Sequence, residues 1–367
     1  MTNPKTSRST SVVSQLADRV LIQASCPDAL KIAGTVAPMA GGMVVTGPEA
    51  LQAVGRIRRA NSSVLLCADT AAETRVAATA EAPFELGEAN LIDEPSLQRS
   101  LDAQRERGAS VALTPTGHIA AGDSAALKAA IRQTDKLQDD DIVVRLPCDV
   151  AWATKTYSKQ LAAVIATSNH PVALSLAADQ DPLTRAGVAE ELWAMAATHP
   201  HLILWRTDLA GLAHLVNGGL AAAIGFSSTL RHGTSPDRPG FVNNRQDRTP
   251  DVLLPDWMRY MKGSKIETVF AATSAPRCHC RTCRGQMLDR FDSTTADKLT
   301  AHLHNAAVLQ QLIGAIDRLD RSARHDWWRQ SVALALTKHT EATAQTNVQL
   351  NASRALRTWS QLPAMAG

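Results

Sequence analysis

The sequence predicts an α/β protein in which a (βα)8 TIM barrel is followed by a helical C-terminal region. Two observations predict this fold. Short apolar runs alternate with amphipathic stretches almost to residue 275, and from about residue 295 the pattern is helical. The chain has 367 residues, 45% of them hydrophobic, which is enough for a large core. By length alone the chain could hold two domains, but barrels of βα units routinely run to roughly 200–250 residues as one domain.

Nine runs are apolar enough to be strands buried on both faces, as parallel strands are. They are residues 20–23, 43–45, 64–67, 111–113, 142–146, 172–176, 202–205, 221–226 and 268–271. Helical patterns lie between them, at 49–59, 123–137, 158–167, 183–197 and 209–216. Eight or nine such units favour a barrel, with one strand in excess.

A doubly wound open sheet is the alternative, but no glycine-rich phosphate loop follows the first strand. The pattern therefore divides the chain into a loose polar tail at 1–16, a barrel at 17–275 and a C-terminal region at 276–367. Trp327 and Trp328 are expected to anchor that last region on the barrel.

The most specific motif is Cys-x-Cys-x-x-Cys, formed by Cys278, Cys280 and Cys283. Thiolates and imidazoles in a closed set of four are typical of structural zinc sites. His302 and His304 follow on a predicted helix, and either could supply the fourth ligand. Because they are two residues apart on a helix, only one can face the cysteines. We therefore expect a structural Zn²⁺ that ties a loop to a helix.

The first 20 residues carry charges and lack the apolar stretch of a signal peptide. No apolar run is long enough to span a membrane, so no membrane partner is expected and the predicted location is the cytoplasm. The net charge is only +3, but arginines crowd two segments, 227–250 and the cysteine motif. Such patches bind phosphate backbones, although a solvated arginine-rich surface is an equally good interpretation.

The barrel, the cysteine motif and the later His304-Asn305 pair together resemble the tRNA-guanine transglycosylase family. Members of that family are zinc-containing (βα)8 enzymes that exchange guanine for a 7-deazaguanine base in nucleic acid. The family motif ends in His-Asn, and this resemblance selects His304 over His302. Residues 201–212 and 218–226 are similar to the segments around the family's nucleophile strand. The resemblance covers most of residues 60–320.

The catalytic motifs depart from the family pattern. The family nucleophile is an aspartate near the end of that strand, where this chain has Ala223, Ile224 or Gly225. A second family aspartate opens an Asp-Ser-Gly-Gly-Phe-Gln motif and acts as general acid/base. The matching segment 68–73 keeps the aspartate, as Asp69, and lacks the glycines.

Carboxylates at the carboxyl ends of barrel strands are well placed for catalysis. Asp69, Asp149, Asp179 and Asp208 all follow predicted strands. Base exchange needs one carboxylate as nucleophile and another to move protons. We assign catalytic roles to Asp69, Asp149 and Asp208, and substrate binding to Asp179 and to two further residues of the rim, Arg231 and His232. Capping of the following helix is the competing interpretation for each aspartate.

Three functions are compatible with these residues. The first is a pentosyltransferase that exchanges guanine for a deazapurine base in tRNA or DNA, with the target base flipped out or single-stranded. The second is a catalytically inactive paralogue that binds nucleic acid or an active partner. The third, an unrelated barrel enzyme, leaves the His-Asn match unexplained. The resemblance also allows a homodimer, or a heteromer with a related subunit.

Overall fold

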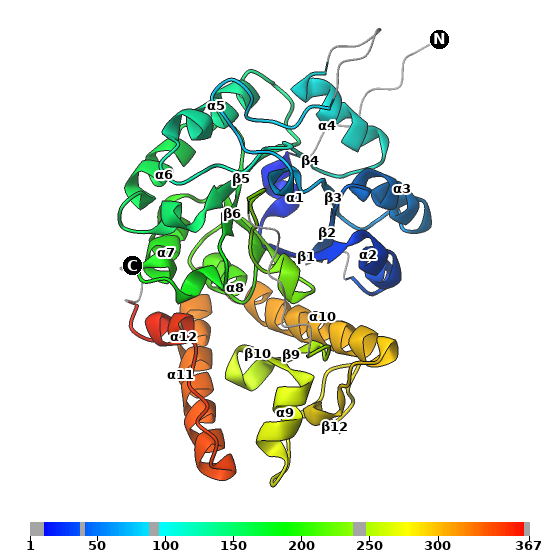
Figure 1. Ribbon diagram of the computed structural model, residues 1–367, viewed down its shortest axis with the longest axis vertical. Helices are drawn as coiled ribbons and strands as arrows, with labels where there is room; N and C mark the ends of the chain where they lie inside the picture. Colours follow the sequence, from blue (N-terminus) through cyan, green and yellow to red (C-terminus); the bar gives the residue numbers. More distant parts are fainter. Residues whose placement is uncertain (1–10, 37–40, 88–94, 238–246, 363–367) are drawn as a thin grey trace.

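Eight parallel strands form a nearly closed sheet, consistent with an α/β barrel of the TIM type (Figure 1). The computed structural model describes residues 11–36, 41–87, 95–237 and 247–362. The strand order is β3-β2-β1-β8-β7-β6-β5-β4, and a bridge between Cys67 and Val111 joins its two edges. The strands are β1 (Arg19–Ser25), β2 (Gly41–Thr46), β3 (Leu66–Asp69), β4 (Ala112–Leu113), β5 (Ile142–Asp149), β6 (Val172–Ala177), β7 (Leu202–Thr207) and β8 (Ala221–Gly225).

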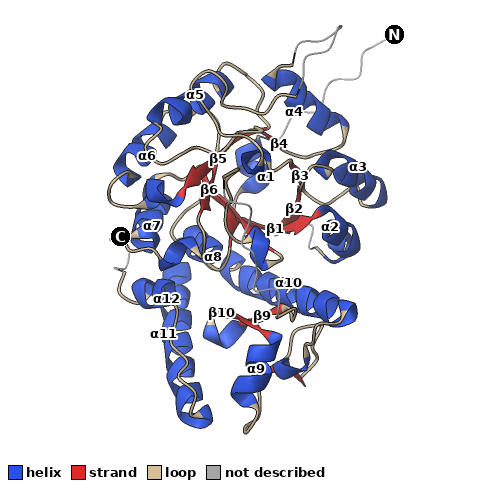
Figure 2. Ribbon diagram, viewed as in Figure 1, coloured by secondary structure: helices blue, strands red, loops and turns tan. Residues whose placement is uncertain are grey.

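Helices follow most of the strands and cover the outside of the sheet (Figure 2). Several begin at side-chain caps; Asp123, for example, accepts a hydrogen bond from the amide of Ala126 at 2.9 Å. The helices are α1 (Val12–Leu16), α2 (Cys26–Ile32), α3 (Ala50–Ala60), α4 (Leu97–Glu106), α5 (Ser124–Thr134), α6 (Ser158–Ile165), α7 (Val188–Thr198) and α8 (Ala210–Val216).

Alternate strand residues divide the apolar core into two layers, because successive side chains of a strand point to opposite faces. One layer, which includes Leu21, Val44 and Ile203, fills the inside of the barrel. Ile22 and Ala24 of the same first strand instead pack with α2 and α3 outside it. The inner positions of β8 are alanines, and the largest side chain of this layer is Trp205 of the neighbouring strand β7.

Described residues from Asp251 onward form a C-terminal module beside the barrel (Figure 1). The hairpin of β9 and β10 packs on α10, while α11 packs on α8 and α12 on α7. Its elements are β9 (Asp251–Leu254), β10 (Arg259–Lys262), α9 (Gly263–Phe270), β11 (Arg277–Cys278), β12 (Gln286–Met287), α10 (Thr295–Asp317), α11 (Arg321–Thr346) and α12 (Arg354–Trp359). None of the helices in the described ranges has both the length and the apolar character needed to cross a bilayer.

Two expectations from the sequence need correction. The ninth predicted strand, at 268–271, lies at the end of helix α9, where Ile266, Val269 and Phe270 are buried at helical spacing. A short apolar run does not distinguish a strand from a buried helix segment. Within the expected loose tail 1–16, Val12–Leu16 forms helix α1, and its two end residues pack against the interior layer of the barrel. Residues 1–10 of that tail lie outside the described ranges.

Of the two tryptophans expected to anchor the C-terminal region, Trp328 is buried and packs against α12, whereas Trp327 is only partly buried. The exposed fraction of Trp328 is 1%, and its ring centroid lies 5.3 Å from that of Trp359 on α12. We expect Trp328→Ala to lower the free energy of unfolding by about 3–5 kcal/mol, because it leaves a large cavity. Trp327→Ala is the matched control and should cost less than half as much, since Trp327 is only partly buried. Denaturant unfolding followed by circular dichroism measures both; equal losses would contradict this packing.

Candidate metal centre and barrel rim

Three cysteines and one histidine of the C-terminal module form a buried cluster. One ligand atom from each of Cys278, Cys280, Cys283 and His304 lies within 4.8 Å of the others. The β11–β12 turn positions the thiols, because the amides of Cys280 and Cys283 each point at the preceding sulfur, at 3.4 Å. These bonds favour the thiolate form that metal binding requires. The four residues predicted from the motif therefore do come together.

His304 reaches the cluster from helix α10 with a defined orientation. Its Nδ1 lies 3.2 Å from the sulfur of Cys283 and 3.5 Å from that of Cys280. Its Nε2 lies 2.8 Å from the carbonyl oxygen of Leu253, to which a protonated Nε2 would donate. A hydrogen bond of this kind fixes the tautomer in which Nδ1 is free to bind metal. His302 is outside the cluster and lies against the ring of Phe226, 4.4 Å between centroids.

Asn305, the next residue, explains why an asparagine follows the histidine. Its side-chain oxygen accepts from the amide of Leu253 at 2.7 Å, and its nitrogen donates to the carbonyl of Asp251 at 2.8 Å. The amide thus pairs with strand β9 as a neighbouring strand would. His304 and Asn305 together hold α10 on the hairpin.

The donor set fits zinc, whose structural sites are closed sets of thiolates and imidazoles. Three thiolates and one neutral imidazole around Zn²⁺ leave one negative charge. With Zn²⁺ bound, Arg290 would offset this charge, since one of its terminal nitrogens lies 3.3 Å from the sulfur of Cys283. The guanidinium carbon of Arg290 lies 4.1 Å from the centroid of the Phe291 ring, and this contact holds the guanidinium in place.

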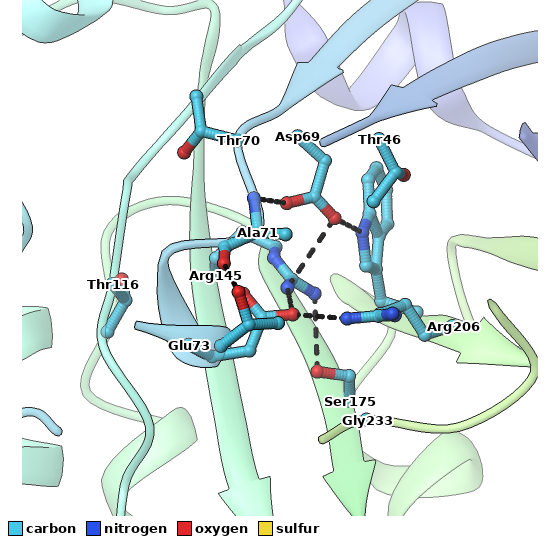
Figure 3. A network of polar contacts seen from close by, with 12 residues as sticks. Thr46, Asp69, Thr70, Ala71, Glu73, Thr116, Arg145, Ser175, Arg206 and Gly233 are labelled. Carbon is cyan, nitrogen blue, oxygen red and sulfur yellow. Dashed lines mark hydrogen bonds and ion pairs between the residues drawn. The ribbon is translucent and has the colours of Figure 1, made fainter. Parts of the chain in front are cut away.

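A second buried polar cluster occupies the mouth of the barrel (Figure 3). Arg145 of β5 bonds to Glu73 at 2.9 Å and lies 3.5 Å from a carboxylate oxygen of Asp69. Arg206 of β7 also binds Glu73, at 2.7 Å. Its φ of 48° accompanies a register irregularity in β7. This left-handed residue lets Arg206 as well as Trp205 face the interior.

Both carboxylate oxygens of Asp69 accept hydrogen bonds from groups of the protein. One oxygen accepts from the indole of Trp205 at 2.9 Å and from Gln23 at 3.0 Å, and the other accepts from the amide of Ala71 at 3.0 Å. Burial alone would raise the pKa of Asp69. The charges of Arg145 and Arg206, together with these bonds, hold it below the usual aspartate value. Asp69 is therefore a buried, ionised carboxylate.

The other three predicted aspartates are placed differently. The carboxylate of Asp149 accepts a hydrogen bond from the amide of Ala151 at 2.8 Å. This is the capping role that competed with catalysis in the sequence interpretation. Asp179 is exposed after β6. Asp208 caps the segment before α8 through the amide of Ala210, at 2.9 Å, but also lines a cavity.

This cavity, which we call the rim cavity, has a volume of about 520 Å³. It lies where the rim at β6–β8 meets the β9–β10 hairpin and α12. Two residues predicted to bind substrate, Arg231 and His232, line it together with Asp208. Burial lowers the pKa of His232, which favours its neutral form. The structure thus brings together Asp208, Arg231 and His232, whereas Asp69 lies in the separate buried cluster.

Sequence reasoning missed several members of both sites. Glu73, Arg145 and Arg206 looked like ordinary charged residues, although an arginine inside an apolar strand run was a signal for Arg145. Asp181 and Tyr260 also line the rim cavity. Asp181 follows β6 closely and could have been included with Asp179; nothing in the sequence singled out Tyr260.

Comparison with known proteins gave no relative: neither a protein-family model nor a curated protein sequence matches the chain.

Removing the histidine ligand tests the metal centre. His304→Ala should lower zinc affinity by more than about a hundredfold, because a ligand matters more than the surrounding residues, which are worth roughly 10–100-fold. His302→Ala is the matched control and should retain one zinc per chain. Metal analysis of protein purified without chelators measures both. Wild-type protein without stoichiometric zinc would contradict the zinc assignment.

Asp69 is expected to be structural. Asp69→Asn should lower the free energy of unfolding by about 3–5 kcal/mol, because it leaves buried arginine charge unpaired. Asp149→Asn should cost less than about 1 kcal/mol, since asparagine also caps.

The Asp69 effect should also depend on pH. A depressed folded-state pKa gives stability that is present above the unfolded value, about 3.9, and is lost as pH falls through the folded value. The difference between wild type and Asp69→Asn should therefore shrink in acid. Denaturant titrations at several pH values test this, and a constant difference would contradict the depressed pKa.

Proposed function

We propose that this protein is a transglycosylase-like, zinc-stapled barrel that binds nucleic acid and does not exchange its bases. The proposal combines the family resemblance with the geometry of the barrel mouth. Zn²⁺ is its structural cofactor, held by the three cysteines and His304. The single observation that carries the proposal is that backbone atoms fill the space at the strand end where the family has its nucleophile.

Gly225, the last residue of β8, has no room for any side chain. A Cβ atom on Gly225 would lie 2.4 Å from the carbonyl carbon of Leu230 and 2.7 Å from the amide nitrogen of Arg231. Real Cβ atoms do not approach backbone so closely, and backbone cannot move aside as a side-chain end can. Ala223 packs inside the barrel, and Ile224 is buried in the core cluster shared with the helices. None of the three aligned positions therefore offers a carboxylate to a sugar.

Asp69, which aligns with the family's general acid/base, is also out of reach of a substrate. Asp69 is 4% exposed, and the gap beside Asp69, Glu73 and Arg145 has no room for a water molecule. A proton-transfer group must come within hydrogen-bond distance of its substrate. Entry of a purine or deazapurine base would require the buried ion pairs to separate.

Basic side chains at the metal centre support nucleic-acid binding. Arg277, Arg281 and Arg284 are exposed on the loop that the cysteines order. No carboxylate within the described ranges pairs with them at ion-pair distance. Metal binding would fix this loop, so that its arginines meet a phosphate backbone with little further loss of entropy. Of the basic residues in the other arginine-rich segment, Arg238 and Arg245 lie outside the described ranges, and Arg248 is exposed.

Base exchange in tRNA or DNA is the competing function, and one observation favours it. Asp208 and Asp181 both line the rim cavity, which is large enough for a nucleoside. An exchange reaction with relocated roles would use these two carboxylates. A role as the inactive partner of a related, active subunit is also compatible with the proposal. It would not change the assignment of the residues at the barrel mouth.

One experiment separates the two functions. Zinc-loaded protein is incubated with isotopic guanine and either tRNA or duplex DNA, and binding to each polymer is followed by fluorescence anisotropy across salt concentrations. We expect binding without incorporation. Incorporation that disappears in Asp208→Asn would replace the proposal with base exchange.

The double variant Arg277→Gln/Arg284→Gln tests the binding surface. It should weaken binding and reduce the slope of log affinity against log salt by about two for duplex DNA, since each lost phosphate contact is worth about 0.9. Arg59→Gln/Arg132→Gln removes the same charge from exposed positions on α3 and α5 and should leave the slope unchanged. An equal loss in both double variants would mean that only net charge matters.

A further inference from the structure

Two buried hydrogen-bond donors in the wall of the rim cavity have no partner. The side chain of Arg231 is 10% exposed, and its Nη2 makes no hydrogen bond among the described residues. The hydroxyl of Tyr260 is buried as well and has no partner among them. Both residues line the cavity. Buried polar atoms normally bond to protein, to water or to a bound molecule, so these donors require an acceptor that the protein does not supply.

Contacts with the protein fix the position of the Arg231 guanidinium. Its Nε donates to the carbonyl of Gly225 at 3.2 Å, and its Nη1 lies 3.5 Å from a carboxylate oxygen of Asp251. Its central carbon lies 3.4 Å from the centroid of the Tyr260 ring, so the guanidinium stacks on that ring. Burial raises the pKa of Tyr260 to about 12, which keeps the hydroxyl protonated. The two unpartnered donors therefore belong to one fixed, stacked pair.

The carboxylates that line the cavity do not supply this acceptor. Asp251 is shared between Arg231 and Lys262, at 3.5 Å and 3.7 Å, and it contacts Nη1 of the arginine. Burial raises the pKa of Asp208, which disfavours its charged form. Asp181 is exposed, so water screens its charge. None of the three accepts a hydrogen bond from Nη2.

Arg259 adds a positive charge to the same wall of the cavity. One of its terminal nitrogens donates to the carbonyl of Asn351 at 3.1 Å, and no carboxylate of the described residues lies at ion-pair distance from it. Burial lowers the pKa of Arg259, because no nearby carboxylate offsets the lost hydration. Against the one carboxylate of Asp251, this wall has the cations of Arg231, Arg259 and Lys262. The wall that carries the unpartnered donors is therefore positively charged.

We propose that the rim cavity binds a small molecule by an oxyanion, a carboxylate or a phosphate, seated at Nη2 of Arg231 and the hydroxyl of Tyr260. An oxyanion offers an oxygen to each donor, and charge-assisted hydrogen bonds are stronger than neutral ones. Met258 and Trp359 line the same cavity and offer apolar surface to the body of the ligand. This site goes beyond the proposed function, because the arginines of the metal-centre loop are not part of the cavity lining.

Calorimetric titration with probes that share a benzyl group tests the proposal. The probes are the anions phenylacetate and benzylphosphonate, the neutral phenylacetamide and the cationic phenethylamine. We expect saturable binding of at least one anion, with the amide and the amine binding at least about tenfold more weakly, because hydrogen bonds between charged groups are worth more than neutral ones. Equal binding of the amide, preference for the amine, or no saturable binding of either anion at millimolar concentration would overturn the proposal.

Tyr260→Phe locates the binding. The substitution removes a hydroxyl that has no partner in the protein, so the melting temperature should not fall, while affinity for the anionic probe should fall about tenfold. Tyr157→Phe makes the same change at the other tyrosine of the chain, outside the cavity lining, and should bind normally. Arg231→Lys keeps the charge but lacks Nη2 and should also bind more weakly. Unchanged affinity in Tyr260→Phe and Arg231→Lys would show that the anion binds elsewhere.

The tyrosine variant also separates this site from the nucleic-acid surface. Tyr260→Phe should bind tRNA and duplex DNA as the wild type does, since the proposed phosphate contacts come from the metal-centre loop. A matching loss of nucleic-acid affinity would assign the two donors to a backbone phosphate and overturn the small-molecule site. Failure of the wild type to bind nucleic acid would remove the proposed function, whereas saturable binding of the anionic probe would still support this site.

Discussion

Two arginines inside the barrel mouth need two buried carboxylates, and this requirement determines what the barrel can hold. Arg145 and Arg206 share the carboxylate of Glu73, and Arg145 also lies beside Asp69. A buried charge without a partner is far more costly than a hydrogen-bonded pair, so the four side chains stabilise one another only as a set. They occupy the space in which a barrel enzyme would place its substrate.

Because these four side chains fill the centre of the barrel mouth, the accessible cavity lies at one side of the rim. With the centre filled, the cavity lies over β6, β7 and β8, where the hairpin and α12 supply the outer wall. The C-terminal module is therefore part of the site as well as a support. Its position depends on His304 and Asn305, which bond to the backbone of β9 and so connect the metal centre with the strand that carries Asp251.

The sequence was sufficient for features that depend on local pattern. Apolar runs predicted all eight barrel strands, and the cysteine spacing predicted three members of the cluster. The family resemblance selected His304 over His302 as the fourth. It was insufficient where a residue's role depends on distant partners. Asp69 looks like a catalytic aspartate because it ends a strand, but its role follows from Trp205 and Arg145, which are distant in sequence. The inward turn of Arg206 depends on a positive φ at a residue that rarely adopts one. The segment 268–271 was misassigned because only its packing shows that it is helical.

The last helix of the described chain has a consequence for the order in which the molecule is completed. All eight barrel strands and all four cluster residues precede residue 305, whereas Ser353, Ala355 and Trp359 form part of the rim cavity wall. During synthesis, the residues of the barrel strands and of the cysteine cluster are available before those that close the cavity. Proteolytic loss of α12 would open the cavity to solvent while leaving the cysteine cluster in place. Among the described residues, the wall of the rim cavity is thus completed after the barrel strands and the cysteine cluster have been synthesised.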